Sequence, residues 1–94
     1  MEFLVRINVL LPPDTATEVD LHERELRRGQ ELRASGVIAR IWRIPGQTAN
    51  VGIWRAEDAT KLHAAISSLP LFPWMTVEVT PLATHHLEES SQST

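Results

Sequence analysis

Glu25 is the residue whose type and position most clearly suggest chemistry, because it falls inside the apolar stripe of an expected helix. At about 100° per residue, Leu21 and Leu32 lie within about 40° of Glu25 on that helix. Burial penalises the charged form of a carboxylate and raises its pKa, which is how enzymes obtain a proton shuttle that works near neutral pH. Gly29, one turn further on, could leave space for a ligand.

The rest of this helix sets the limits of the stripe and leaves a second role open for Glu25. Val19 and Leu26 are expected on the far side of the stripe. The charged residues expected to lie away from it are Asp20, Arg24, Arg27, Arg28 and Glu31. The alternative role is structural: Glu25 lies at the edge of the stripe, or pairs with an arginine such as Arg6 or Arg40.

Two arginines on an expected strand are the second candidate feature. Alternation along that strand places Arg40 on the same side as Trp42, and Arg43 on the opposite side. An arginine in an otherwise apolar strand either pairs with an acid or receives an anionic ligand, and its planar guanidinium suits a carboxylate. Pairing with Glu78 or Glu2 is the structural alternative.

Other chemistries find little support in the sequence. The adjacent His85 and His86 have no third ligand at useful spacing, so no metal site is expected. The Ser67-Ser68 pair lacks the turn and the His–Asp support of a nucleophile. The absence of cysteine excludes thiolate and disulfide chemistry, and the four glycines form no phosphate-binding pattern. A net charge of −3 does not suggest a nucleic-acid partner, which requires a basic surface.

Six elements must position these side chains. Alternation, helical spacing and breaker residues predict strands over residues 2–10, 37–44, 49–55 and 75–80, and helices over residues 17–35 and 58–69. Thr17 and Asp20 resemble a capping box at the start of the first helix, and Gly36 suits its end. The order is the split βαβ arrangement, so we expect an α+β, ferredoxin-like fold with a four-stranded antiparallel sheet and both helices on one face.

The length and composition predict one small domain. Ninety-four residues leave no room for a second core, and we place the domain at residues 1–83 and a polar tail at residues 84–94. No targeting leader and no apolar run of the about 20 residues needed to cross a bilayer are found, so we expect a cytoplasmic protein without a membrane partner. Both faces of the second expected strand carry apolar residues, with Ile38, Trp42 and Ile44 on one side and Val37, Ala39 and Ile41 on the other, which predicts a homo-oligomer.

Two segments carry a resemblance to a known family. The run from Arg40 to Asn50 is similar to the LWRI-x-G-x-x-AN hairpin of the muconolactone Δ-isomerases, and residues 69–75 nearly reproduce their LPLFPYM segment, with Trp74 in place of the tyrosine. Val77-Glu78-Val79, His85 and the opening strand that ends at Leu11-Pro12 also match, so the resemblance spans residues 1 to about 86.

The resemblance implies a ferredoxin-like protomer in a ring-like decamer. It also implies a cofactor-free isomerase of the β-ketoadipate branch of aromatic catabolism, which converts muconolactone to 3-oxoadipate enol-lactone by moving one proton. The family's helix glutamate aligns with Glu25. The resemblance makes Arg40 or Arg43 the clamp for the substrate carboxylate and Asn50 a hydrogen-bond donor, and it adds Gln47, Thr48 and Phe72 as substrate-binding positions.

Departures from the family pattern keep other functions open. Typical members have histidine at Arg40, His-Tyr at Gln47-Thr48, tyrosine at Val51 and Phe-Asp at Trp54-Arg55, whereas this chain has no tyrosine. One alternative is a related enzyme with another lactone or acid as substrate, such as a halolactone dehalogenase or a biosynthetic isomerase. The other is a non-catalytic ligand-binding module, which does not need an acid in its apolar stripe.

Overall fold

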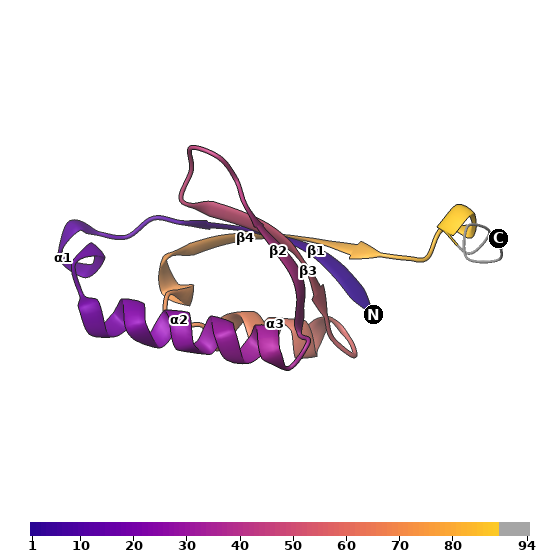
Figure 1. Ribbon diagram of the computed structural model, residues 1–94, viewed down its shortest axis with the longest axis horizontal. Helices are drawn as coiled ribbons and strands as arrows, with labels where there is room; N and C mark the ends of the chain where they lie inside the picture. Colours follow the sequence, from indigo (N-terminus) through magenta and orange to yellow (C-terminus); the bar gives the residue numbers. More distant parts are fainter. Residues whose placement is uncertain (89–94) are drawn as a thin grey trace.

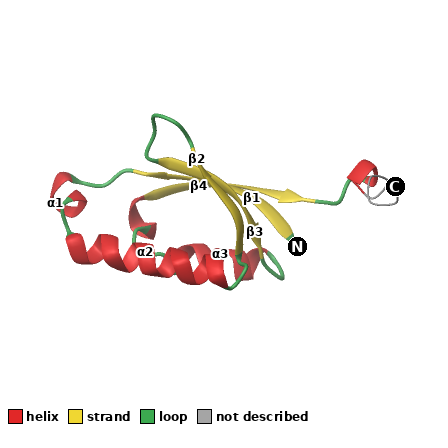
Figure 2. Cartoon of the chain, in the orientation of Figure 1, coloured by secondary structure: helices red, strands yellow, loops and turns green. Residues whose placement is uncertain are grey.

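The structure, a computed structural model, describes residues 1–88 and shows a sheet covered on one face by helices (Figures 1 and 2). In chain order the elements are β1 (Glu2–Val9), α1 (Pro13–Ala16), α2 (Val19–Ala34), β2 (Ile38–Arg43), β3 (Ala49–Arg55), α3 (Ala59–Ser67), the 3-10 helix η1 (Phe72–Trp74) and β4 (Met75–Leu82). The strands are antiparallel and lie in the order β2-β3-β1-β4. The predicted ferredoxin-like fold is confirmed, with α2 and α3 on the same face.

The predicted start is correct for α3 and wrong for α2. Asp58 caps α3 by accepting the Lys61 backbone N–H at 2.8 Å. The capping box predicted at Thr17 is wrong: α2 begins at Val19, and its N-cap residue Glu18 makes no side-chain capping bond. The reason is that Pro13 opens the separate short helix α1, and the Thr17 hydroxyl donates to the Asp14 carbonyl of that turn.

A β-bulge in β2 decides which side chains face the helices. The register shifts between Ile38, which pairs with Trp54, and Arg40, which pairs with Ile53. Directly paired residues lie on the same face of a sheet. From Arg40 onward the predicted alternation is confirmed, but the prediction that Ile38 shares the face of Trp42 is wrong, because the extra residue at the bulge reverses the alternation.

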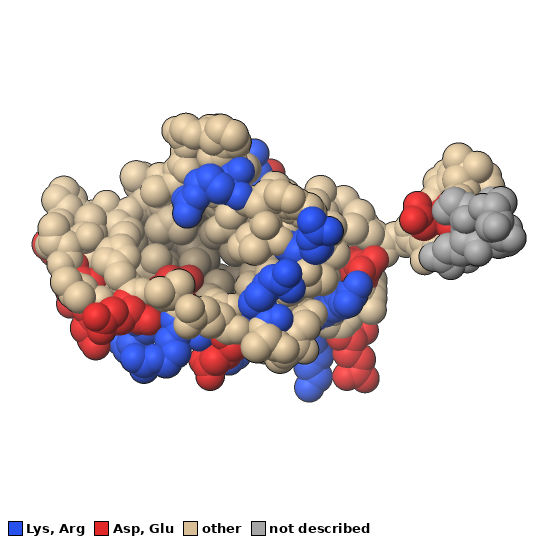
Figure 3. Space-filling view, viewed as in Figure 1, with Lys and Arg blue, Asp and Glu red and all other residues tan. Residues whose placement is uncertain are grey.

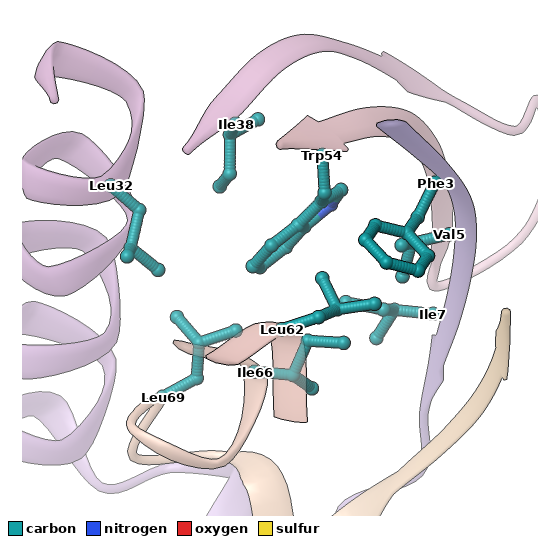
Figure 4. Close-up of a cluster of buried hydrophobic side chains, with 9 residues drawn as sticks. All are labelled: Phe3, Val5, Ile7, Leu32, Ile38, Trp54, Leu62, Ile66 and Leu69. Atoms are coloured by element: carbon teal, nitrogen blue, oxygen red, sulfur yellow. The ribbon is translucent and has the colours of Figure 1, made fainter. Parts of the chain in front are cut away.

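The hydrophobic core lies between the sheet and the two helices, and Figure 4 shows Trp54 at its centre, with side chains from β1, α2, β2, α3 and the chain after α3 around it. Its nine buried members are Phe3, Val5, Ile7, Leu32, Ile38, Trp54, Leu62, Ile66 and Leu69. Val19 and Leu26, predicted on the apolar stripe, are 69% and 63% exposed. The core therefore holds the C-terminal half of α2, while Leu21 in the N-terminal half is buried outside this cluster.

Beyond β4 the chain leaves the body of the molecule. Figure 1 shows the end of β4 and the following residues extending away from the two layers, with a short helical turn at residues 86–88 that leaves Leu87 exposed. The second part of the predicted tail, residues 89–94, lies outside the described residues. Among the described helices, none is both long enough and apolar enough to cross a membrane.

Candidate functional site

Glu25 lies on the inner side of α2, between Leu21 and Leu32, which are both buried. This confirms the central prediction from helical periodicity. The glutamate itself is half-buried, and a Cβ placed at Gly29, one turn further along, would meet no atom within 4 Å. The helix therefore presents one carboxylate beside open space. Arg28 departs from its predicted position, because its Nε donates to the Ser68 hydroxyl at the end of α3.

The carboxylate of Glu25 is held by a backbone group from the chain that follows α3. Glu25 Oε1 accepts the Leu71 N–H at 2.8 Å. In this turn, Pro70 and Pro73 have no N–H, and the N–H groups of Phe72 and Trp74 bond to carbonyls within the turn. The buried Leu71 N–H is the donor that remains, and Glu25 satisfies it.

The environment of Glu25 favours its protonated form. Burial raises the pKa of the Glu25 carboxyl above the usual 4.5, while the Leu71 hydrogen bond and the charge of His22 lower the pKa and offset only part of the effect. One oxygen is engaged by Leu71, which leaves Oε2 as the oxygen able to exchange a proton with a ligand. A carboxyl with these properties is suited to general acid–base catalysis.

The structure contradicts the alternative in which Glu25 pairs with Arg6 or Arg40. Arg6 donates to Asn8 Oδ1 at 3.1 Å and to Gln47 Oε1 at 3.0 Å, and the guanidinium of Arg40 lies 4.9 Å from the ring centre of Trp42. Both arginines are on the sheet face that lacks helices, because they pair with Val51 and Ile53. The pairing suggested between an arginine of β2 and Glu2 is also wrong, since Glu2 bonds to Arg55 at 3.2 Å.

Arg43 and Asn50, in contrast, lie on the same sheet face as the helices. Arg43 pairs with Asn50 across β2 and β3, and Asn50 pairs with the buried Ile7 on β1. Arg43 and Asn50 also line a recess of about 220 Å³. The Oδ1 atom of Asn50 is buried and has no hydrogen-bond partner within the described residues. A buried amide oxygen and a guanidinium, neither with a side-chain partner within residues 1–88, form the arrangement that a polar ligand would complete.

The remaining predicted substrate-binding residues are not brought together with Glu25. Gln47 lies in the β2–β3 turn, where its side chain accepts from Arg6, and Thr48 nearby contributes its carbonyl to the Val9 N–H. Phe72 lines a separate apolar cavity of about 460 Å³ between α3 and β4, with its ring edge-on to His63 at 6.0 Å between centres. Arg40 lies on the sheet face without helices, away from Glu25.

The surface between α2 and the β2–β3 hairpin is hollowed (Figure 3). Figure 3 shows a depression between α2 and the β2–β3 hairpin, with basic side chains on the hairpin side of it. Three or more potential metal ligands are nowhere clustered in residues 1–88. The described residues thus offer one acid–base carboxyl on α2 and, on the helix-covered face of the sheet, one amide and one guanidinium that line the same recess.

Sequence reasoning found Glu25 but missed its partner, the Leu71 N–H. The two residues are 46 positions apart, and a backbone donor leaves no signature in a side-chain pattern. The one available signal was the spacing of Pro70 and Pro73, which leaves few donors in a turn that also carries buried apolar residues.

Comparison with known proteins identifies related chains and a related fold. Residues 1–88 match the family model described as muconolactone delta-isomerase. The chain is 41% identical over 85 residues to a muconolactone Delta-isomerase of Rhodococcus opacus, covering 88% of this chain and 91% of the relative. It is also 41% identical over 87 residues to muconolactone Delta-isomerase 1 of Acinetobacter lwoffii, covering 90% and 91%. A crystal structure of muconolactone isomerase superposes with a TM-score of 0.81 at 36% identity, covering 90% of this chain and 91% of that one.

Proposed function

The chain belongs to the muconolactone Δ-isomerase family, and we propose that it converts muconolactone to 3-oxoadipate enol-lactone with Glu25 as its acid–base group. Family membership makes the protein an isomerase. The observation that supports the role of Glu25 is a half-buried carboxyl on α2 beside open space, with a raised pKa and with one oxygen that has no partner among the described residues.

The reaction needs a base that returns the proton it removes. Glu25 in its carboxylate form takes the ring proton at the carbon that bears the side chain, and the released electron pair spreads through the ring double bond to the lactone carbonyl. The carboxylic acid then delivers the proton two carbons along this allylic system. The double bond has moved, no atom is gained or lost, and Glu25 is again a carboxylate.

Arg43 and Asn50 are proposed to hold the substrate. The guanidinium of Arg43 would receive the substrate's side-chain carboxylate, because it is the β2 arginine on the face of Glu25. The Oδ1 atom of Asn50 is buried without a partner in the described part of the chain. Rotation of the amide would present its NH₂ group to the site, where it would donate a hydrogen bond to the lactone carbonyl oxygen as negative charge develops there. No residue needs to supply a cofactor site for this chemistry.

A homo-oligomer, with the decamer as the expected form, is part of the same proposal. Two features support it: the sheet face without helices carries partly exposed Leu4 and Trp42, and the chain after β4 extends away from the body. The proposal also includes a domain over residues 1–83 with a tail over residues 84–94. A cytoplasmic location is proposed as well, because a carboxylate substrate crosses a bilayer poorly.

The direct test is to incubate the purified chain with muconolactone and follow the ultraviolet absorbance. Loss of muconolactone with formation of the enol-lactone is expected, without added metal or cofactor. The proposal is wrong on substrate if muconolactone is unchanged while another unsaturated lactone is converted.

A further inference from the structure

Two side-chain hydrogen bonds within the described residues connect α2 to the end of α3 and the chain that follows it. One is the Leu71 N–H to Glu25, at 2.8 Å. The other runs from Arg28 Nε to the Ser68 hydroxyl, at 2.9 Å. Arg28 is three residues after Glu25, and Ser68 is three residues before Leu71. The two hydrogen bonds therefore connect the same two segments at neighbouring positions.

Ser68 links Arg28 on α2 to the end of α3. It is the C-cap residue of α3, and its hydroxyl accepts from Arg28 while donating to the Ala65 carbonyl at 2.6 Å. From Ser68 the chain reaches Leu71 through Leu69, which is anchored in the core, and through Pro70, which restricts the backbone. Arg28 also lies 3.8 Å from Glu31, a weaker contact that keeps the guanidinium near the surface of α2.

We propose that Arg28 and Ser68 are positioning residues, whose hydrogen bond holds the end of α3 against α2 so that the Leu71 N–H stays on Glu25. This rests on the proposed role of Glu25 as the base. The Leu71 hydrogen bond fixes Oε1 as the bound oxygen and directs Oε2 to the substrate. Neither Arg28 nor Ser68 touches the substrate in this scheme.

The proposal predicts a specific change in pH dependence. The Leu71 hydrogen bond stabilises the charged form of Glu25, so loosening it leaves the effect of burial less opposed and raises the pKa further. On the same helix, His22 and Arg28 flank Glu25, and the sheet contributes Arg43 on its helix-covered face. The segment from Leu69 to Trp74 carries no titratable side chain.

The experiment compares pH profiles of kcat/KM for muconolactone in Ser68→Ala, Arg28→Met and Arg28→Lys. Ser68→Ala changes no charge, so it separates positioning from electrostatics. In Ser68→Ala and Arg28→Met, the acid limb of the profile, where kcat/KM falls as Glu25 is protonated, is expected to move to higher pH by about 0.5 unit or more, the scale of one lost hydrogen bond. The lost activity should be recovered at higher pH. Arg28→Lys should lie between wild type and Arg28→Met. Arg24→Met, which removes the same charge from an exposed pair with Asp20, should leave the limb in place.

The outcomes separate this inference from the proposed function. If Glu25→Gln is inactive but Ser68→Ala and Arg28→Met keep the wild-type limb, the positioning role is wrong and the role of Glu25 stands. If Arg28→Met and Arg24→Met move the acid limb equally while Ser68→Ala does not move it, the lost charge is responsible. That result would also overturn the positioning role. If Glu25→Gln is fully active, the proposed function itself fails.

Discussion

At the scale of single residues, Glu25 has two roles that a substitution can separate. It satisfies a buried backbone donor, which is structural, and its carboxyl has a raised pKa and one oxygen without a hydrogen-bond partner in residues 1–88, which suits catalysis. Glutamine retains an oxygen that can accept the Leu71 N–H but cannot act as a base. Leucine would retain neither and would leave the N–H unpaired, at a cost of about 1–3 kcal/mol.

Glu25→Gln should become more stable relative to wild type as pH rises. The folded-state pKa of Glu25 lies above the usual 4.5, so the folded protein holds this proton more tightly than the unfolded chain does. Well below pH 4.5 Glu25 is protonated in both the folded and the unfolded protein, so its ionisation does not lower the free energy of unfolding. The cost of ionisation develops between that pH and the raised pKa, and is constant above it. Urea unfolding of both proteins at several pH values measures the difference.

Glu23→Gln is the matched control, because it removes one negative charge from the exposed side of the same helix. A stability difference that is the same at all pH values, or equal to that of Glu23→Gln, would contradict the buried-carboxyl interpretation.

Arg43, and not Arg40, should recognise the substrate carboxylate. Arg43→Met is expected to lower kcat/KM for the lactone acid by about ten- to a hundredfold, the scale of 1.5–3 kcal/mol for a charged hydrogen bond, and to affect the methyl ester much less. Arg40→Met, on the opposite face, is the control and should change the acid-to-ester ratio little. Acid-to-ester ratios that are equal in wild type and Arg43→Met would show that the anion is bound elsewhere.

At the scale of elements, the bulge in β2 determines which arginine faces α2. Gly52 makes the bulge possible, because a Cβ at this position would collide with the carbonyl oxygen of Arg40. Opposite Gly52 lies Ile41, the first residue after the bulge to return to the helix face. The identity of the proposed anion clamp thus depends on a glycine in the neighbouring strand.

Gly52→Ala should destabilise the fold by about 1–3 kcal/mol, the usual cost of forcing a methyl group into a filled space, and should reduce activity by displacing Arg43. Gly29→Ala is the control: its Cβ would meet open space, and alanine favours a helix by about 1 kcal/mol. Urea midpoints of the two variants should therefore move in opposite directions. A Gly52→Ala protein as stable as wild type would mean that the strand pairs differently.

The elements show what sequence can and cannot predict. The period of α2 placed Glu25 beside Leu21 and Leu32 correctly, because helical spacing is a local property. The bulge was missed, because it depends on the contact between Gly52 and Arg40 in two paired strands. The bond from Leu71 was missed for the same reason, since it exists only after α2 and the turn beyond α3 have packed together.

At the scale of the whole molecule, a sheet with one uncovered face and an extended C-terminal segment does not form a closed unit. Trp42 is 47% exposed and Leu4 37% exposed on the uncovered face, and Leu87 is exposed on the extension. Apolar groups of this kind on a chain of 94 residues are more stable when covered by another copy.

Light scattering at micromolar concentration should therefore give a mass well above that of a dimer. Trp42→Glu, which puts a charge on the uncovered face, should shift the protein toward smaller species, whereas Arg24→Met on the outer side of α2 should not. A stable wild-type species of 10.6 kDa would contradict the expected assembly.

The role of Glu25 as the proton-transferring base is the central claim, and kcat/KM of Glu25→Gln for muconolactone tests it most directly. The variant should keep the wild-type circular dichroism spectrum and assembly, because its amide still accepts the Leu71 N–H. Its kcat/KM should fall by at least about 10²-fold, the scale of general acid–base catalysis. A folded Glu25→Gln protein that isomerises muconolactone as fast as wild type would show that Glu25 is structural and that another group moves the proton.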